Sequence, residues 1–571
     1  DQPRSRGLGD VYKRQSTYAP HLQSMASHSH RTIAVLGGGI SGLTATYALA
    51  RALPRDAYRI VVLEANSRLG GWMESHRASC ASGAPLLESG PRSIRPVGYR
   101  GFRTIELVCF FRMVFYKQLK DLGMIDRMLL VSRKTPSARN RFLYYGGRLN
   151  RLPSSAISAI EAVARIPFLR SVIWRMLREP FIPRSDAILA GADESVHDFC
   201  ARRFGEEAAT TMVSAVIHGI YAGDSRELSV RSVMSGLVAL EKTHGSMLRS
   251  LLPTLLNARY QAPALPRSKH IKQKLAEVQA RLDPELVNRL KETSIYSFPH
   301  GLGELITSLE KASLAMPNVE IWRNAPCERI DDLTLYPRGR PPLKADRVIS
   351  AIPAAKFAPF AQSLPHLAYN PSAHLAVVDV VLSGDTLRLP IEGFGYLVPR
   401  NATPNADEIL GVILDSDAVP NQTDLRPDGI RPFVKLTVMM GGPYWRHRDL
   451  LPTEPEAEVR ALRALEQQLG LPSSLLATNV RLIRSRVLRN TIPQYLVGHM
   501  SRLAELQEAM LRDNTWRGRL SLLGNSYGGV GVNDCIALAL DTSEAIVRHE
   551  YGDESACAAS TGLAHILEEA P

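Results

Sequence analysis

Closely spaced glycines followed by a carboxylate are the residues of this sequence that are best suited to bind a charged cofactor. Residues 37–42 carry the pattern G-x-G-x-x-G, whose glycines permit a tight turn and let the backbone approach a pyrophosphate. Glu64 follows at about the 20-residue offset expected for the acid that binds ribose hydroxyls. We therefore predict a dinucleotide site that includes Gly37, Gly38, Gly39, Ile40, Ser41, Gly42 and Glu64.

The segments around these glycines must form a strand and a helix for such a site to work. Ile33–Leu36 is an apolar run typical of a buried strand, and Leu43–Leu49 is helix-like. A second apolar run, Ile60–Leu63, ends directly at Glu64. In this order the turn leaves the N-terminus of the helix facing the phosphates of the cofactor.

A second glycine pair favours a flavin. The segment Arg68-Leu69-Gly70-Gly71-Trp72 resembles the flavin-binding extension of amine oxidase-like flavoproteins, so we expect FAD rather than NAD. Near the other end of the chain, Leu520–Leu523 predicts a strand, and the glycine-rich residues 524–531 predict a turn before a helix. The N-terminus of that helix could face the flavin ring or the pyrophosphate.

The same turn also supports an alternative from another class of enzyme. Residues 524–528 match the G-x-S-x-G nucleophile elbow around Ser526, and Asp541 and His549 follow in the order found in serine hydrolases. The elbow requires a helix directly behind the serine, whereas further glycines up to Gly531 delay it here. The sequence also contains no H-G-G-G segment for an oxyanion hole.

Composition limits the class of protein and its partners. A chain of 571 residues is long enough for two or three domains. The net charge of +13 permits an acidic membrane, a multiply carboxylated small molecule or nucleic acid as a partner. Nucleic acid is the weakest of these, and we expect none, because the arginines are scattered and neither an RNP-like nor a zinc-finger pattern occurs. The six cysteines lie far apart without a C-x-x-C pair, so no metal site is predicted.

One helix-like segment, Phe168–Glu179, has two interpretations. Its apolar residues are predicted to share one face, from which the arginines are excluded; they are Phe168, Leu169, Val172, Ile173, Met176 and Leu177. Such a helix can lie on a membrane surface, or it can pack on a protein core like most amphipathic helices. Arginines interrupt every apolar run before it reaches the roughly 18 residues needed to span a bilayer, so membrane contact would be superficial.

We predict an α/β (α+β) fold with three parts and two terminal segments. A Rossmann-like FAD-binding domain is assembled from the discontinuous segments 30–100, 293–360 and 512–552. A helical, membrane-associating lobe covers 101–235, and a mixed-sheet substrate domain covers 236–292 and 361–511. Residues 1–29 form a disordered, targeting or artefactual leader, since Met25 could be the true start, and residues 553–571 form a tail.

With these residues in view, the chain resembles the mitochondrial-type, oxygen-dependent protoporphyrinogen oxidases of the amine oxidase-like FAD superfamily. Two of the matching segments, Val35–Leu43 and Arg68–Trp72, are shared across the superfamily. Others are particular to the family and follow its order along the chain: Gly90–Pro96, Asn140–Tyr144, Tyr221–Ser229, Gly393–Pro399 and Gly524–Ile536.

The resemblance implies how the substrate would be bound. Protoporphyrinogen IX is an apolar macrocycle with two propionates, so its site should be a hydrophobic slot with a cation at one end. Arg141 matches the arginine that pairs with a propionate. Phe394 and Leu397 match the residues that sandwich the rings, and Gly219 matches a position in the same cavity. No catalytic acid or base is expected, because the cofactor carries the chemistry and the protein positions the substrate.

The resemblance also implies a set of cofactor contacts, a location and partners. The positions that match FAD contacts, besides those at 37–42 and Glu64, are Ala65, Arg68, Gly71, Trp72, Gly90, Pro91, Arg92, Ser93, Cys327, Asn525, Val530, Gly531 and Val532. FAD would be non-covalent, as no cysteine stands in a covalent-flavin context near the C-terminus. The implied reaction removes six electrons and releases hydrogen peroxide from O2, in heme biosynthesis. The implied place is the surface of the inner mitochondrial membrane, with a homodimer and the iron-inserting enzyme of the heme pathway as possible partners.

Three points remain open or depart from the family pattern. An amine-oxidising relative within the superfamily is the nearest alternative. About ten extra residues, roughly 109–119, interrupt the pattern and could be absorbed as helical turns. The Lys-rich stretch 255–292 is longer than the family pattern and is predicted to be exposed.

Overall fold

The computed structural model describes residues 30–115, 124–153, 156–250, 266–384, 387–422 and 431–569. The predicted leader, residues 1–29, lies outside this part of the chain, as do residues 116–119 of the extra segment. Helix α3 (Gly98–Phe115) runs through the first part of that segment.

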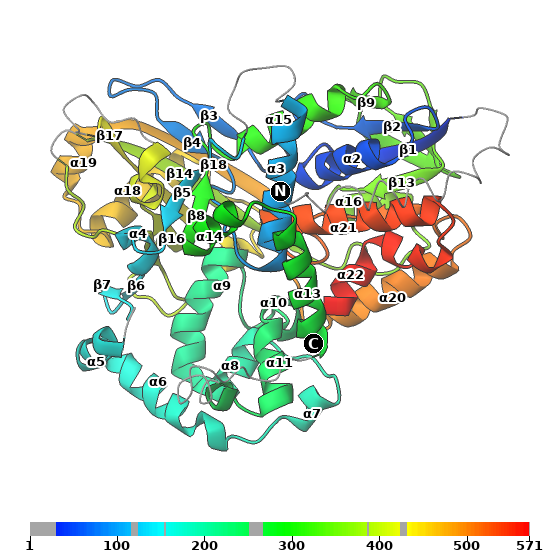
Figure 1. Cartoon of the computed structure of the whole chain (residues 1–571). Coiled ribbons are helices and arrows are strands. Elements are labelled where there is room, and N and C mark those ends of the chain that lie inside the picture. The colour runs from blue at the N-terminus through cyan, green and yellow to red at the C-terminus, as the bar shows by residue number, and fades with distance from the viewer. Residues whose placement is uncertain are drawn as a thin grey trace, which may run out of the picture.

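A five-stranded parallel sheet lies at the upper right of the molecule in Figure 1. Its order is β19-β13-β1-β2-β9, and its strands are β1 (Arg31–Leu36), β2 (Tyr58–Leu63), β9 (Val319–Trp322), β13 (Arg347–Ser350) and β19 (Leu520–Leu522). The sheet thus joins three distant stretches of the chain. β1, β2 and β13 are almost entirely buried, which explains why the sequence shows continuous apolar runs rather than alternation.

Two long helices pack on each other beside this sheet. α2 (Ile40–Ala52) begins directly after β1, and α21 (Val532–Glu550) begins after the turn that follows β19. Figure 1 shows them lying alongside one another although nearly the whole chain separates them. Since the strands are parallel, the turns after β1 and β19 meet at the same edge of the sheet.

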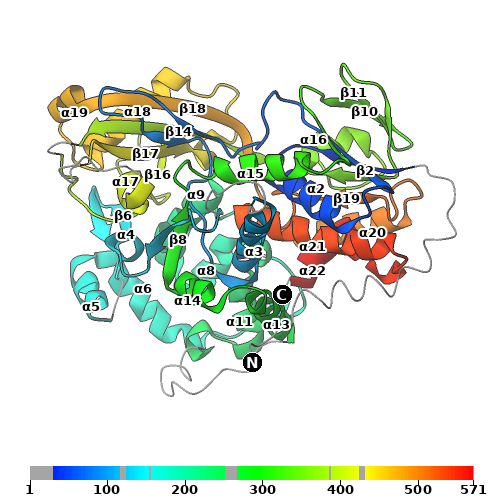
Figure 2. The same cartoon turned by 45° about the horizontal axis from the view of Figure 1, so that its top comes forward.

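A seven-stranded sheet lies at the upper left of Figure 2, with helices α18 (Glu454–Gln467) and α19 (Ser473–Asn479) against it. Its order is β18-β14-β17-β16-β15-β6-β7, with strands β18 (Val480–Pro493), β14 (Ser372–Ser383), β17 (Phe433–Gly441), β16 (Ile409–Ile413), β15 (Gly395–Leu397), β6 (Phe142–Tyr145) and β7 (Arg148–Arg151). All neighbours are antiparallel except β15 and β6, so the sheet is mixed.

The stretch 101–235 is less uniformly helical than we predicted. It forms the helices at the bottom of Figure 1, among them α5 (Ala156–Arg165), α6 (Pro167–Arg178), α8 (Val196–Phe204) and α9 (Ser214–Tyr221). It also contributes β5 (Leu129–Ser132), β6 and β7, and the last two extend the seven-stranded sheet. The turn Gly146-Gly147, with both residues at positive φ, was the local signal for a β-hairpin.

The apolar residues that we predicted on one face of α6 differ in exposure along the helix. Phe168, Leu169 and Val172 are buried, whereas Met176 is 41% exposed and Leu177 57% exposed. The first half of the helix therefore packs on the core, and its second half extends beyond the core. Apolar residues at helical spacing are buried in the first half and exposed in the second.

The prediction that the stretch 255–292 is exposed holds for most of residues 271–292, but four apolar side chains among them are buried. Residues 266–292 form α13 (Pro266–Ala280) and α14 (Pro284–Glu292). Val278, Leu282, Val287 and Leu290 are buried in the same core as the parallel sheet. These apolar residues recur at helical spacing among the lysines, and the overall polarity concealed them.

The fold class is confirmed: the molecule is mixed α/β, with a parallel sheet assembled from discontinuous segments and a mixed second sheet. The residue ranges of the three domains stay a prediction. The segment separated as a tail is packed, because α22 (Leu563–Glu569) places Leu563 and Ile566 in the main core.

Candidate functional site

The glycine turn after β1 leaves an open helix N-terminus. Gly37 has a φ of +97°, and a Cβ on Gly42 would lie 2.0 Å from the carbonyl oxygen of Gly37, so both positions need glycine. Gly39 caps α2 without any side-chain hydrogen bond, and a Cβ built there meets no atom within 4 Å. The first N–H groups of α2 therefore face free space, which suits the binding of a phosphate.

The predicted ribose-binding carboxylate lies beside this turn. Glu64 is buried and accepts hydrogen bonds of 2.8 Å from the backbone N–H groups of Gly38 and Asn66. The backbone N–H of Ala325 donates to the Glu64 carbonyl oxygen at 2.9 Å, which brings the approach to β10 (Cys327–Asp331) alongside Ala65. Cys327 thus belongs to the same corner of the molecule as Glu64.

The second glycine pair closes onto the first turn. The N–H of Gly70 donates to the Gly38 carbonyl oxygen at 2.8 Å, and a Cβ on Gly71 would lie 3.7 Å from the Cα of Gly39. Gly90 packs on the backbone of Trp72, since a Cβ on Gly90 would lie 2.1 Å from the Trp72 oxygen. The Arg68 side chain folds back on its own loop, where it donates hydrogen bonds to the carbonyl oxygens of Leu69 and Gly71.

Arg92 links this loop to the second sheet. Its guanidinium lies 3.1 Å from Asp415 and 3.2 Å from Asp379. Burial opposes its charge, but Asp415 and Asp379 outweigh burial and raise the pKa of Arg92. Between Pro91 and Ser93, the Arg92 carbonyl oxygen accepts a hydrogen bond of 3.0 Å from the Ser297 hydroxyl. Arg92 therefore ties the loop in place through protein carboxylates.

The predicted C-terminal turn reaches the same edge of the sheet. A Cβ on Gly524 would meet only Ala351 and Ser41, at 3.8 and 4.0 Å, so the turn stands close to the start of α2. Asn525 and Val530 lie within the turn, and Gly531 caps α21, which begins at Val532. The open space at Gly39 and Gly524, the free helix N–H groups and the Glu64 carboxylate together fit an FAD molecule.

The four predicted substrate residues form two contact pairs, one at each end of β15 (Gly395–Leu397). β15 pairs with β6 so that Tyr396 lies opposite Phe142, which places Arg141 next to Phe394 across the two strands. The guanidinium carbon of Arg141 lies 4.9 Å from the centre of the Phe394 ring. At the other end of β15, a Cβ on Gly219 would lie 2.7 Å from a terminal carbon of Leu397.

Arg141 is a cation without a carboxylate partner among the described residues. It is half-buried and donates to the carbonyl oxygen of Ser137 at 2.7 Å. Burial, together with the nearby positive charge of Arg95, lowers the pKa of Arg141. Two arginines without an intervening acid suit a substrate that carries carboxylates.

Sequence reasoning missed two apolar residues and one cation near this place. Val216 and Ile220, 38% and 54% exposed, lie three residues before and one residue after Gly219 on α9. Helical spacing from Gly219 could have identified Val216, because residues three apart share a face. Arg95 stands in the Gly90–Pro96 segment, but nothing in its sequence context indicated the proximity to Arg141.

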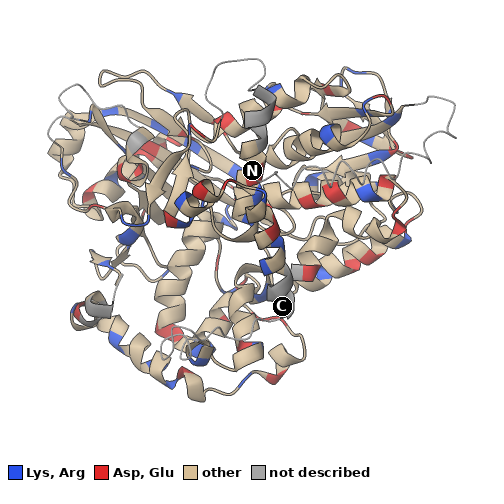
Figure 3. Ribbon diagram, viewed as in Figure 1, with Lys and Arg blue, Asp and Glu red and all other residues tan. Residues whose placement is uncertain are grey.

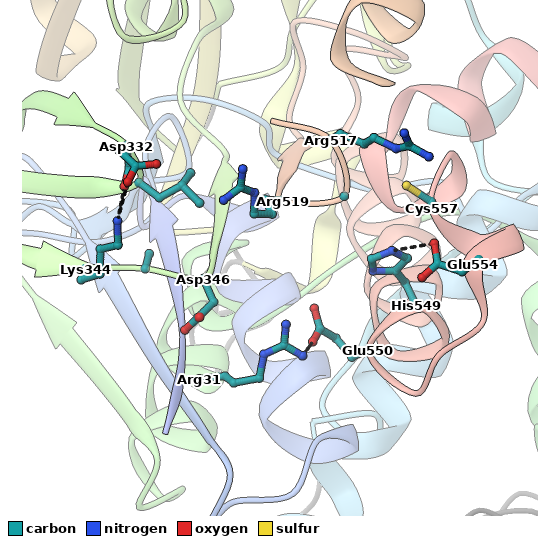
Figure 4. A pocket seen from close by; sticks show the side chains of 13 residues that line it. Arg31, Asp332, Lys344, Asp346, Arg517, Arg519, His549, Glu550, Glu554 and Cys557 are labelled. Atoms are coloured by element: carbon teal, nitrogen blue, oxygen red, sulfur yellow. Dashed lines mark hydrogen bonds and ion pairs between the residues drawn. The ribbon is translucent and has the colours of Figure 1, made fainter. Parts of the chain in front are cut away.

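Ser526, Asp541 and His549, the residues of the serine hydrolase alternative, do not form a catalytic triad. The Ser526 hydroxyl is buried and accepts a hydrogen bond from the N–H of Ala354 at 3.0 Å. The carboxylate of Asp541 accepts from the Tyr99 hydroxyl at 2.6 Å. His549 lines a separate cavity of about 480 Å³ near the amino ends of the parallel strands, where it faces Glu554 (Figure 4). Since the glycine turns lie at the carboxyl ends, this cavity is not the dinucleotide site.

Comparisons with known proteins agree with this geometry. The model of the family described as flavin containing amine oxidoreductase matches residues 40–547. A protoporphyrinogen oxidase of Schizosaccharomyces pombe is 35% identical over 88% of this chain and 96% of its own length. The human protoporphyrinogen oxidase is 36% identical over 89% of this chain and 96% of its own. The chain belongs to the protoporphyrinogen oxidase family of flavin-containing amine oxidoreductases.

A solved structure supports the fold of this protoporphyrinogen oxidase family member. A crystallised Exiguobacterium protein, described as a candidate protoporphyrinogen oxidase, superposes with a TM-score of 0.65 at 22% identity and covers 92% of this chain and 100% of its own. Membership of the family confirms the prediction of FAD as the cofactor and of an oxidoreductase. Which residues contact FAD and the substrate stays a prediction that the geometry above makes specific.

Proposed function

We propose that this family member oxidises protoporphyrinogen IX to protoporphyrin IX and passes the electrons to O2. The observation that carries the proposal is the cation Arg141, which lacks a carboxylate partner among the described residues and packs on Phe394, three residues before the Leu397 that contacts Gly219. A cation beside apolar side chains is complementary to a flat apolar ring system with carboxylates on one edge. The Schizosaccharomyces pombe and human relatives are both named as oxidases of this substrate.

Each of these residues has a role in positioning the substrate. Arg141 would bind a propionate by charge-assisted hydrogen bonds. Phe394 and Leu397 would contact the faces of the macrocycle, and the missing side chain at Gly219 leaves room opposite Leu397. Bound FAD supplies the hydride acceptor. The protein then contributes orientation and the exclusion of water, and none of the predicted substrate residues is a proton-transfer group at neutral pH.

The electron balance is fixed by the product. The substrate loses six electrons and six hydrogens, so three molecules of O2 are reduced to three of hydrogen peroxide. Titration of peroxide against porphyrin formed should therefore give a ratio of three.

Anaerobic addition of protoporphyrinogen to the purified yellow protein tests the proposal. The flavin absorbance should bleach and should return when O2 is admitted. Bleaching by amines such as putrescine or cyclohexylamine, with none by protoporphyrinogen, would favour the amine-oxidising alternative. A colourless protein that cannot be reconstituted with FAD would exclude both.

We also infer that the helical part contacts a membrane surface. Three large apolar side chains stand out from α6 and the turn after it: Trp174 and Leu177, each 57% exposed, and Phe181, 82% exposed. The sequence of α6 carries Arg170, Arg175 and Arg178 and no acidic residue, whereas the bottom of the molecule as a whole has both basic and acidic segments (Figure 3). The guanidinium carbon of Arg178 lies 4.8 Å from the Trp174 ring centre. Exposed aromatic residues beside cations are typical of surfaces that bind anionic lipid.

This contact would be peripheral. Within the described residues, no helix combines the length and the apolarity needed to cross a bilayer. The inner mitochondrial membrane, an interaction with the iron-inserting enzyme and a homodimer stay predictions of the family resemblance.

A further inference from the structure

The C-terminal turn between β19 and α21 depends on residues outside itself for its conformation. It contains Gly524 and Gly529 at positive φ, +103° and +144°, which leaves the backbone unusually free in the unfolded chain. A turn of this kind needs hydrogen bonds from elsewhere to hold one conformation.

Tyr495 binds the turn at two points. This fully buried side chain follows β18, and its hydroxyl donates to the carbonyl oxygen of Asn525. The same hydroxyl accepts a hydrogen bond of 2.9 Å from the backbone N–H of Gly529. One hydroxyl thus bridges two backbone groups that are four residues apart.

His499 binds the turn between those two points. Its ring is stacked on that of Tyr495, with centres 4.4 Å apart and planes 15° apart. Its Nε2 lies 2.7 Å from the carbonyl oxygen of Tyr527, which can only accept, so Nε2 carries the proton. Nδ1 then accepts from the hydroxyl of Tyr369. This assigns one neutral tautomer, and burial agrees with it by lowering the pKa of His499 to about 4.

We propose that Tyr495 and His499 form a clamp that holds the turn 524–531 in the conformation that receives FAD. Together they bind three backbone groups of the turn, at Asn525, Tyr527 and Gly529. Both are positioning residues, because they act through the turn. The inference rests on the proposed FAD site and adds the residues that order one side of it before the cofactor arrives.

Tyr495→Phe is the sharpest test, because it keeps the stacked ring and removes only the hydroxyl. Loss of a hydrogen bond that leaves the Gly529 N–H without its partner should weaken FAD binding about tenfold. Isothermal titration of apoprotein with FAD measures this. Hydrogen exchange of the apoprotein should also be faster at residues 525–529.

Tyr221→Phe is the matched control. The Tyr221 ring packs against Tyr495 edge to face, with centres 6.1 Å apart, but its hydroxyl makes no hydrogen bond to the turn. FAD affinity and exchange at 525–529 should stay at wild-type values. His499→Phe serves as a second test, since it keeps an aromatic ring in the stack and removes the bond to Tyr527.

Unchanged FAD affinity and unchanged exchange in Tyr495→Phe would overturn the clamp, provided that circular dichroism shows an intact fold. If Tyr495→Phe does not fold, the same two measurements on His499→Phe decide. A wild-type protein that binds no FAD would contradict the proposed function instead, and the exchange rates at 525–529 would still report on the clamp.

Discussion

The guanidinium of Arg141 stacks over the ring of Phe394 and has no carboxylate partner among the described residues. A half-buried cation without a counter-ion is costly unless a ligand supplies the charge. Phe394 stands just before β15, whose last residue, Leu397, lies against Gly219 of α9. We propose that this pair lies where the polar edge of a bound substrate meets its apolar faces.

Replacing Arg141 should weaken substrate binding without affecting the flavin. We expect Arg141→Met to raise the KM for protoporphyrinogen by about 10-fold or more, the effect of losing a hydrogen bond to a charged group. Flavin content and kcat should change little, because Arg141 lies just before β6 of the seven-stranded sheet and not at the glycine turns of the parallel sheet. Steady-state kinetics with flavin absorbance measures both.

A matched control for this variant is Arg148→Met. Arg148 stands on the neighbouring strand β7, is exposed, and donates to the carbonyl oxygen of Arg165. Its replacement should leave KM unchanged. Equal KM values for wild type and Arg141→Met would contradict the role of Arg141.

Adding one methyl group at Gly219 should narrow the slot. The new Cβ would lie 2.7 Å from a terminal carbon of Leu397, so Leu397 must move. We expect kcat/KM of Gly219→Ala to fall about 10-fold. The melting temperature should not fall, since alanine is favoured over glycine within a helix such as α9.

The double variant Gly219→Ala/Leu397→Ala isolates the cause. Removing the Leu397 side chain makes room for the methyl group, so the loss from Gly219→Ala should be smaller in this background. Identical losses in both backgrounds would show that the methyl group acts elsewhere than against Leu397.

The parts of the site that depend on local signals could be predicted from the sequence. The glycines at 37–42 and the apolar runs beside them determine a strand, a turn and a helix within a short stretch. The same holds for the terminal turn before α21. The meeting of Arg141, Phe394 and Gly219 was expected from the family resemblance, and no local pattern indicates it.

What could not be predicted arises from pairing between distant segments. Parallel pairing of β15 with β6 brings Arg141 to Phe394. The partners of Arg92 lie on β14 of the seven-stranded sheet (Asp379) and on the helix α17 (Asp415–Ala418). Tyr495 and His499 match no motif, because their function is to bind backbone groups that the sequence does not reveal. On α6, exposure changes halfway along the helix because the core beneath it ends there.

Charges placed on the outer end of α6 should weaken membrane binding. We expect the double variant Trp174→Glu/Phe181→Glu to bind vesicles of phosphatidylcholine with anionic phospholipid at least about 10-fold less well, because burial of each ring contributes roughly 1.5–3 kcal/mol. Vesicle flotation measures the bound fraction. Leu450→Glu is the control, since Leu450 is 87% exposed just before α18 and away from α6. A loss of the same size in the control would contradict a specific surface on α6.

Glu88 should make stability depend on pH in a defined window. Burial raises the pKa of this carboxyl from 4.5 to about 7, although the hydroxyl of Ser75 and the N–H of Leu302 partly oppose the shift. The folded state therefore binds a proton more tightly than the unfolded state does. The resulting stability is fully present below pH 4.5 and is lost as pH rises to about 7, by roughly 3 kcal/mol at most.

Glu88→Gln removes this titration and should therefore remove the slope. Melting temperatures measured between pH 4.5 and 7.5 should fall with rising pH in the wild type relative to Glu88→Gln. Glu320→Gln is the control, because the hydrogen bond from Arg59 lowers the pKa of Glu320 and moves its titration below this window. If the melting temperatures of wild type and Glu88→Gln change with pH in the same way between pH 4.5 and 7.5, Glu88 ionises at its ordinary pKa.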